Sequence, residues 1–127
     1  MDLGRFSLSL TVKDLAVSRE FYAKLGFEVV PGEDFATPSG LAKYNETWVI
    51  LSNGPDLLGL FQGMFDKNTM TWNPTDVRSV QKRLKKAGIE MAMEADEDST
   101  GPAAAMVFDP DGNPILLDQH DEQGDSP

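Results

Sequence analysis

The residues best suited to proton transfer lie near the end of the chain. Asp118 and His120 place a carboxylate two residues from the only histidine of the sequence. Residues two apart on a strand share a face, so these two side chains would lie together. Such a pair can act in acid–base catalysis or form half of a relocated metal site. It can equally be an exposed strand end, with His120 covering a sheet edge or contacting a partner subunit.

A second oxygen-rich run, Asp109-Pro110-Asp111-Gly112-Asn113, invites comparison with a calcium-binding loop. An EF-hand loop needs a glycine at its sixth position and a glutamate at its twelfth. Neither the position of Gly112 nor the residues downstream meet that requirement. Pro and Gly stand where turns favour them, so this run predicts a hairpin turn.

Hydroxyl and aromatic side chains supply the remaining candidates for a binding site. Ser7 and Ser9 alternate with apolar residues and offer hydrogen bonds on one face of a strand. Ser9 has no recognisable activating base, which argues against a nucleophile. Large apolar side chains would complete a mostly apolar pocket for an aromatic or planar guest, although ordinary core or dimer packing explains them as well. The predicted ligand-binding residues are Ser7, Ser9, Trp48, Phe61, Met70, Trp72 and Leu116.

The elements that position these residues form a repeat. Alternating apolar residues predict a strand over 6–12, and Asp14 can cap a helix over 15–25 that carries the apolar stripe Val17, Phe21 and Leu25 and ends at Gly26. The run Asp76–Glu90 matches Asp14–Glu28 in its opening Asp and in its closing Gly, apolar residue and Glu. The matching runs start at Asp14 and Asp76, and this constant spacing between equivalent residues indicates two copies of one module.

Each module reads as strand, helix and three strands. The further predicted strands cover 27–35, 44–51, 57–64, 70–73, 89–93, 104–108 and 115–119, and the second helix covers 77–87. We therefore expect an α+β fold in which two tandem βαβββ modules form an open cup-shaped mixed sheet with helices outside. The modules span about 5–64 and 69–120 of a single domain over 1–120, and 121–127 is expected to be a flexible acidic tail.

Composition narrows the classes of partner. The net charge is −10, and residues 94–127 contain ten acidic residues and no basic one. Such a field disfavours nucleic acid and anionic lipid and would attract a cation, although a solvated loop and tail explain it too. The sequence contains no cysteine, no signal-peptide pattern and no apolar run long enough for a membrane span. We expect a cytoplasmic protein with no cofactor.

Three runs give the chain a resemblance to the vicinal oxygen chelate superfamily, which includes glyoxalase I, extradiol dioxygenases and bleomycin-resistance proteins. They are 10–30 (LTVKDLAVSREFYAKLGFEVV), 57–63 (LLGLFQG) and 108–120 (FDPDGNPILLDQH). Enzymes of the superfamily hold a divalent metal in the cup with one His or Glu from each of four strands. The matching positions here are Ser7, Gly59, Met70 (or Thr71, one residue along) and Leu116.

None of these four residues is a histidine or a carboxylate, the donors that such a site uses. This departure predicts no metal at the usual positions and argues against glyoxalase I or ring-cleaving chemistry. The resemblance then favours a metal-independent protein that binds a small aromatic or cationic molecule, as a homodimer. The alternative is a lyase, isomerase or dioxygenase type of enzyme that uses Asp118 and His120, with Glu46, around a relocated site. A third class is an interaction protein whose own side chains fill the cup.

Overall fold

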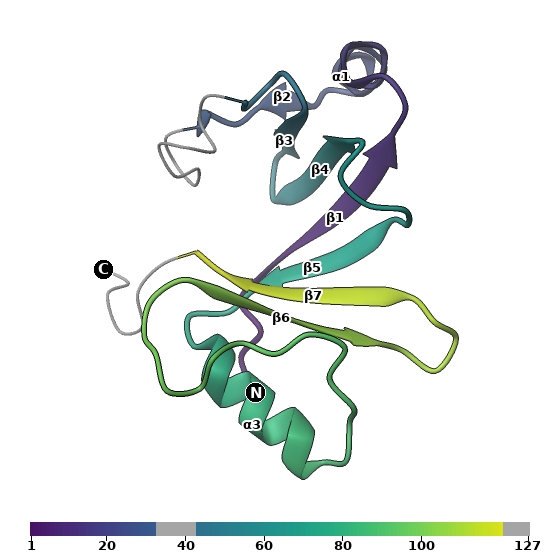
Figure 1. The fold of residues 1–127 in the computed structure, drawn as a ribbon. Coiled ribbons are helices and arrows are strands. Elements are labelled where there is room, and N and C mark those ends of the chain that lie inside the picture. The colour runs from purple at the N-terminus through teal and green to yellow at the C-terminus, as the bar shows by residue number, and fades with distance from the viewer. Residues whose placement is uncertain (33–42, 121–127) are drawn as a thin grey trace. The chain divides into compact units, whose positions relative to one another are not determined.

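The structure, a computed structural model, describes residues 1–32 and 43–120. Within these ranges the chain forms two helices and seven strands, so the predicted α+β class is confirmed (Figure 1). Contacts divide the chain into a first module, Ser7–Asn68, and a second module, Met1–Phe6 with the residues from Thr69 on. In chain order the elements are β1 (Arg5–Val12), α1 (Leu15–Lys24), β2 (Glu28–Val29), β3 (Trp48–Asn53), β4 (Asp56–Gln62), β5 (Thr69–Asn73), α3 (Val77–Lys86), β6 (Ala103–Phe108) and β7 (Pro114–Gln119).

The first module is a mixed sheet in the order β2-β3-β4-β1. Strand β1 runs parallel to β4, with Leu10 opposite Leu60, whereas β2, β3 and β4 are antiparallel. Alternation along the strands sends Val49 and Leu60 to the face on which Leu15 of α1 packs. Burial of these side chains holds α1 against the sheet and leaves the other face available for a site.

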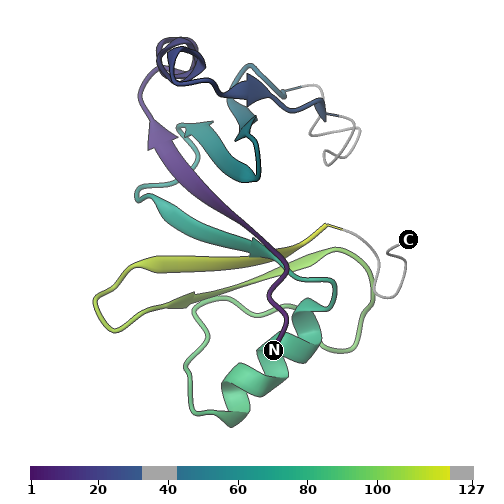
Figure 2. The same ribbon diagram turned by 180° about the vertical axis from the view of Figure 1, so that it is seen from behind.

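The second module repeats this plan with the strand order β5-β7-β6. Strand β5 runs parallel to β7, and β6 is antiparallel to β7. Helix α3 lies along one face of these strands, as Figure 2 shows from behind. Val77 and Val80 of α3 pack there against Ala105 and Leu117.

Both helices begin with the same pair of hydrogen bonds. The N-cap carboxylates of Asp14 and Asp76 accept from backbone N–H groups three residues on, at 3.2 and 3.1 Å. The first N–H of each helix donates to a glutamine at the end of a neighbouring strand: Leu15 to Gln62 Oε1 at 2.7 Å and Val77 to Gln119 Oε1 at 2.9 Å. The predicted cap at Asp14 is confirmed. The two modules also share a strand-to-helix contact that the sequence comparison did not reveal.

The strand expected over 89–93 does not form. Met93 makes a single bridge with Met106, and no ladder joins the segment before it to the described part of the sheet. The prediction failed because buried polar side chains of α3 bind the chain that follows. The amide of Gln81 is completely buried and hydrogen bonds to both N–H and C=O of Ala95.

Arg78 hydrogen bonds to the next part of the chain, the loop that contains Asp96, Ser99 and Gly101. Its guanidinium donates to the carbonyls of Asp96 and Gly101, at 2.7 and 2.8 Å, and to Ser99 Oγ at 2.8 Å. Because Arg78 is buried, these oxygens replace the water that its charge loses. The loop is therefore tied to the helix by a cation and an amide instead of by a ladder.

Three further expectations differ from the structure. The apolar stripe of α1 faces solvent, with Val17, Phe21 and Leu25 exposed by 63, 58 and 58%, because Leu15 and Tyr22 pack on the sheet instead. The third strand begins at Trp48, not at position 44, because Asn45 turns the chain with a φ of 65°. Of the strand expected over 27–35, residues 28–29 form β2, and 33–35 lie outside the described residues, as does the expected tail.

Neither described helix is long and apolar enough to cross a membrane.

Arg78→Met should lower the free energy of unfolding by about 2–4 kcal/mol, because three oxygens lose a charged donor that methionine cannot replace. Urea denaturation measures this. Arg83→Met removes an exposed arginine from the same helix and should change stability by less than about 0.5 kcal/mol. Equal effects of the two substitutions would contradict the role assigned to Arg78.

Candidate functional site

The face of the first module opposite α1 gathers the hydroxyl and aromatic candidates. Strand register places Ser9 opposite Gly59 and Trp48 opposite Phe61, on the opposite face from Leu10 and Leu60. Ser7 shares this face by alternation, and it is buried like Ser9. The structure thus brings together Ser7, Ser9, Trp48 and Phe61, four of the predicted binding residues.

Aromatic rings cover much of this face. The rings of Trp48 and Phe61 are stacked, with centroids 5.9 Å apart and planes at 8°. Phe65 packs on Phe61 at 5.1 Å, and Tyr44 meets Trp48 edge-on at 4.9 Å. We call Tyr44, Trp48, Phe61 and Phe65 the aromatic wall; Tyr44 joins it through Trp48 and also packs against the helix-side core. Partly exposed π faces of this kind can stack on a planar guest or hold a cation.

Two members of the aromatic wall were missed from the sequence. Tyr44 is fixed by its hydroxyl, which donates to Val30 O at 2.6 Å and accepts from Ile50 N–H at 3.0 Å. Phe65 follows β4 in a link whose carbonyl accepts from Thr11 Oγ1 at 2.9 Å. The spacing of Phe65 four residues after Phe61 was the available signal, but a link between strands predicts no side-chain direction.

Gly59, one of the four positions that correspond to metal ligands, lies under the ring of Phe61. A Cβ atom at this position would come within 2.5 Å of a Phe61 ring carbon and 3.3 Å of Ile50 Cδ1. Real Cβ contacts are longer than the first distance, so any side chain at this position must displace the ring. The space that a ligand side chain would need is therefore occupied by the aromatic wall.

In the second module, the register of β5 decides between two candidate positions. Thr71 pairs with Leu116, and Met70 pairs with Ile115. Leu117 and Trp72 pack in the core beneath α3, so Thr71 and Leu116 face away from that helix and Met70 does not. Of the two alternatives, Thr71 is therefore the one that shares a face with Leu116.

Met70 and Trp72 consequently lie on the helix-facing side of their sheet, and not on the open face where the sequence analysis placed them. Trp72 packs against the helix-side core and against Phe6, with ring centroids 4.8 Å apart. Small polar and large apolar residues alternate along β5, so the sequence pattern alone did not show which set faces the helix. Thr69 and Thr71 on the other face are as buried as core residues.

Asp118 and His120 form a contact on the end of β7. Their Oδ2 and Nε2 atoms are 3.0 Å apart, and Asn73 Nδ2 lies 3.4 Å from the same imidazole nitrogen. Both side chains are more than a third exposed, which limits the strength of an ion pair. Glu46 lies in an exposed turn of the other module. The geometry permits proton transfer within the pair.

The described residues contain no group of three or more His, Cys, Asp or Glu side chains arranged to hold a metal ion. The four superfamily positions add two hydroxyls, a glycine and a leucine. A divalent ion needs several N or O donors of adequate strength. The residues present therefore do not fit the metal that the fold implies.

The run Asp109 to Asn113 is a turn, as predicted. Asp109 accepts hydrogen bonds from the backbone N–H groups of Asp111 and Asn113 and from the Asn113 side chain, at 2.8–2.9 Å. These bonds, that of the Asn113 side chain above all, lower the pKa of the Asp109 carboxyl below its ordinary value. Its oxygens serve the hairpin between β6 and β7.

The comparisons with known proteins agree with the fold described above. The family model of the Glyoxalase/Bleomycin resistance protein/Dioxygenase superfamily matches residues 4–117. The chain belongs to this superfamily. No curated protein matches it.

Solved structures show the same fold. A superfamily member from Vibrio splendidus 12B01 is 22% identical, with 91% of this chain and 97% of that one covered and a TM-score of 0.59. A Legionella pneumophila structure described as an NAD-dependent benzaldehyde dehydrogenase is 15% identical, with coverages of 91% and 98% and a TM-score of 0.64. An extradiol ring-cleaving dioxygenase from B. fuscum is 24% identical, with coverages of 94% and 33% and a TM-score of 0.58. At these identities the likeness concerns the fold alone.

Gly59→Ala should cost about 1–3 kcal/mol of unfolding free energy, because the new methyl group pushes the Phe61 ring off Trp48. In a Phe61→Ala background the same substitution should cost less than half as much, since the colliding ring is gone. Urea denaturation of the four proteins gives the coupling. Additive costs would contradict the contact.

Stability should fall in acid partly through Asp109. Its carboxyl has a lower pKa in the folded than in the unfolded chain, so its contribution is complete above the ordinary value of 3.8 and is lost as the pH falls through the lowered folded value. Asp109→Asn should flatten this part of the pH profile of the unfolding free energy. Asp111→Asn, in the same turn, is the control. An unchanged acid slope in Asp109→Asn would refute the prediction.

Proposed function

We propose that the chain is a metal-independent small-molecule-binding member of its superfamily that holds an aromatic or cationic guest on the aromatic wall. The observation that carries the proposal is the ring of Phe61 above Gly59. A side chain at this position cannot reach a metal without moving that ring, and Ser7, Thr71 and Leu116 are poor donors. The position is built for aromatic contact instead of coordination.

The shape and charge of the site favour a planar cation. The rings of Trp48 and Phe61 are stacked with nearly parallel planes, so a planar guest can extend the stack, and a π face attracts positive charge. The hydroxyls of Ser7 and Ser9 lie beneath this face and are buried, so the guest would contact mainly the aromatic rings. The net charge of −10 raises the local concentration of cations and disfavours anions.

A second candidate function rests on the 3.0 Å contact between Asp118 and His120. An enzyme of lyase, isomerase or dioxygenase type could use this pair as an acid and base or as part of a relocated metal site. Among the described residues no third carboxylate or histidine joins the pair. This makes it the weaker of the two candidates.

The exposed stripe of Val17, Phe21 and Leu25 on α1 supports the proposal of a homodimer. Three large apolar side chains at four-residue spacing form a continuous ridge on a helix. A ridge of this kind gains stability when a second copy covers it.

The test combines metal analysis with a matched pair of planar probes. We expect protein soaked in zinc, manganese or iron(II) and then desalted to contain far less than one ion per chain by mass spectrometry. The cation 9-aminoacridine should raise the melting temperature with concentration, as ligand linkage requires, and the anion anthracene-9-carboxylate should not. Phe61→Leu should weaken 9-aminoacridine binding by up to about tenfold through lost ring contact.

Phe21→Leu provides the control, because it changes an exposed phenylalanine outside the aromatic wall. It should leave binding unchanged. Stoichiometric metal that disappears in Asp118→Asn and His120→Ala would favour the enzyme and sink the proposal. Equal stabilisation by the two probes, or equal loss in Phe61→Leu and Phe21→Leu, would also overturn it.

A further inference from the structure

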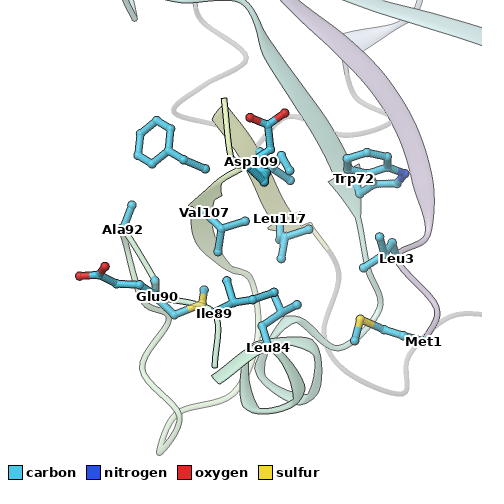
Figure 3. A pocket seen from close by; sticks show the side chains of 14 residues that line it. Met1, Leu3, Trp72, Leu84, Ile89, Glu90, Ala92, Val107, Asp109 and Leu117 are labelled. Atoms are coloured by element: carbon cyan, nitrogen blue, oxygen red, sulfur yellow. The ribbon is translucent and has the colours of Figure 1, made fainter. Parts of the chain in front are cut away.

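A pocket lies within the second module on the helix side of its sheet, away from its open face. Its volume is about 800 Å³, within the range of small-molecule sites. Figure 3 shows Val107 and Leu117 of the strands and Leu84 of α3 at its centre. Trp72 and Leu3 stand on one side, and Glu90 and Ala92 stand on the other.

The pocket exists because residues 89–92 do not join the sheet as a strand. Ile89 N–H bonds back to the Leu84 carbonyl at 3.0 Å, and Ala92 N–H donates to the Met106 carbonyl at 2.8 Å. Between these two fixed points the segment stands off the strands and forms a wall.

Most of the lining is apolar and includes an indole. Twelve of the fourteen lining residues have apolar side chains, and the other two are Glu90 and Asp109. Burying a hydrocarbon chain against such a surface is favourable by roughly 25 cal/mol per Å². Trp72 adds a π face suited to an aromatic group or a cation.

The charged side chains that line the pocket have one sign, and the α-amino group of Met1 is the positive group among its lining residues. Figure 3 shows the carboxylates of Glu90 and Asp109 on different sides of its rim, each directed away from the centre, and no lysine or arginine lines it. Glu90 forms no ion pair within the described residues. The hydrogen bonds of its turn favour the ionised form of Asp109, so its charge persists at neutral pH. An anionic head group would meet two like charges here.

We propose that this pocket binds an apolar organic cation, with its hydrocarbon part on Leu84, Leu117 and Trp72 and its ammonium group at the acidic edge. The site is separate from the aromatic wall, which lies in the other module. It requires no metal and no residue of the aromatic wall. The proposal can therefore fail while the proposed function stands, and the reverse also holds.

Three probes that share one chain and differ in charge test it. Decyltrimethylammonium, decanol and decyl sulfate are titrated below their aggregation limits into Trp48→Phe protein, so that tryptophan emission reports on Trp72 alone. We expect the cation to bind more tightly than decanol, and decyl sulfate to bind at least tenfold more weakly than the cation. Calorimetry on the unaltered protein gives the stoichiometry: one cation per chain in this pocket, with any second cation assigned to the aromatic wall if Phe61→Leu weakens it.

Two substitutions at partly open positions probe the site without removing core residues. Ala92→Trp fills the pocket and should weaken binding at least tenfold. Glu90→Lys reverses one edge charge and should weaken cation binding about fivefold to tenfold while improving the decyl sulfate affinity. Glu20→Lys on α1 makes the same charge change in the other module and is the matched control. Phe61→Leu should leave the decyltrimethylammonium-induced change in Trp72 emission unchanged.

Binding of decyl sulfate or decanol as tight as that of the cation would overturn the proposal, as would an affinity unaffected by Ala92→Trp. An equal effect of Glu90→Lys and Glu20→Lys would show that only net charge matters and would also overturn it. Absence of any binding would do the same.

Discussion

The contact between a strand-end glutamine and the first N–H of a helix sets the geometry of each module. Gln62 and Gln119 occupy equivalent places after a parallel strand, and their Oε1 atoms accept from Leu15 and Val77. The first N–H groups of a helix have no partner within it, and they carry the positive end of its dipole. An acceptor fixed to the sheet therefore determines where the helix starts and which face it covers. The other face is left for ligand contact.

Much of this plan could be read from local sequence. Alternation placed Ser7 and Ser9 on one face, and the N-cap at Asp14 was correct because caps depend on neighbouring backbone groups. The register of β5 could not be read, because buried threonines alternate with apolar residues and leave no polar face to orient the strand. The absence of a strand over 89–93 depends on Arg78 and Gln81, whose partners lie in a loop well beyond the helix. No local sequence pattern predicts that Arg78, an arginine on a helix, is buried.

The open face of the first module illustrates how one fold carries different chemistry. Its strands retain the positions that correspond to metal ligands in the superfamily. The residues there cannot coordinate a metal well, because Ser7 offers only a hydroxyl and Gly59 has no side chain. The rings of Trp48 and Phe61 take up the space instead. On the helix side of the other module, residues 89–92 line a second apolar surface. Its charged side chains are those of Glu90 and Asp109. The two surfaces differ in origin. The first occupies the place of the superfamily's metal site, and the second lies beside residues 89–93, which do not form a strand.

The ring above Gly59 also constrains how this chain can change over evolutionary time. A coordinating side chain at this position collides with Phe61, and loss of Phe61 alone removes the stacking partner of Trp48 before any donor is gained. Each single step toward a metal-binding relative is thus less stable than its starting point. Coordination at this position would therefore require the Phe61 ring to move as well as a donor to appear, and Ser7, Thr71 and Leu116 would still have to be replaced by donors.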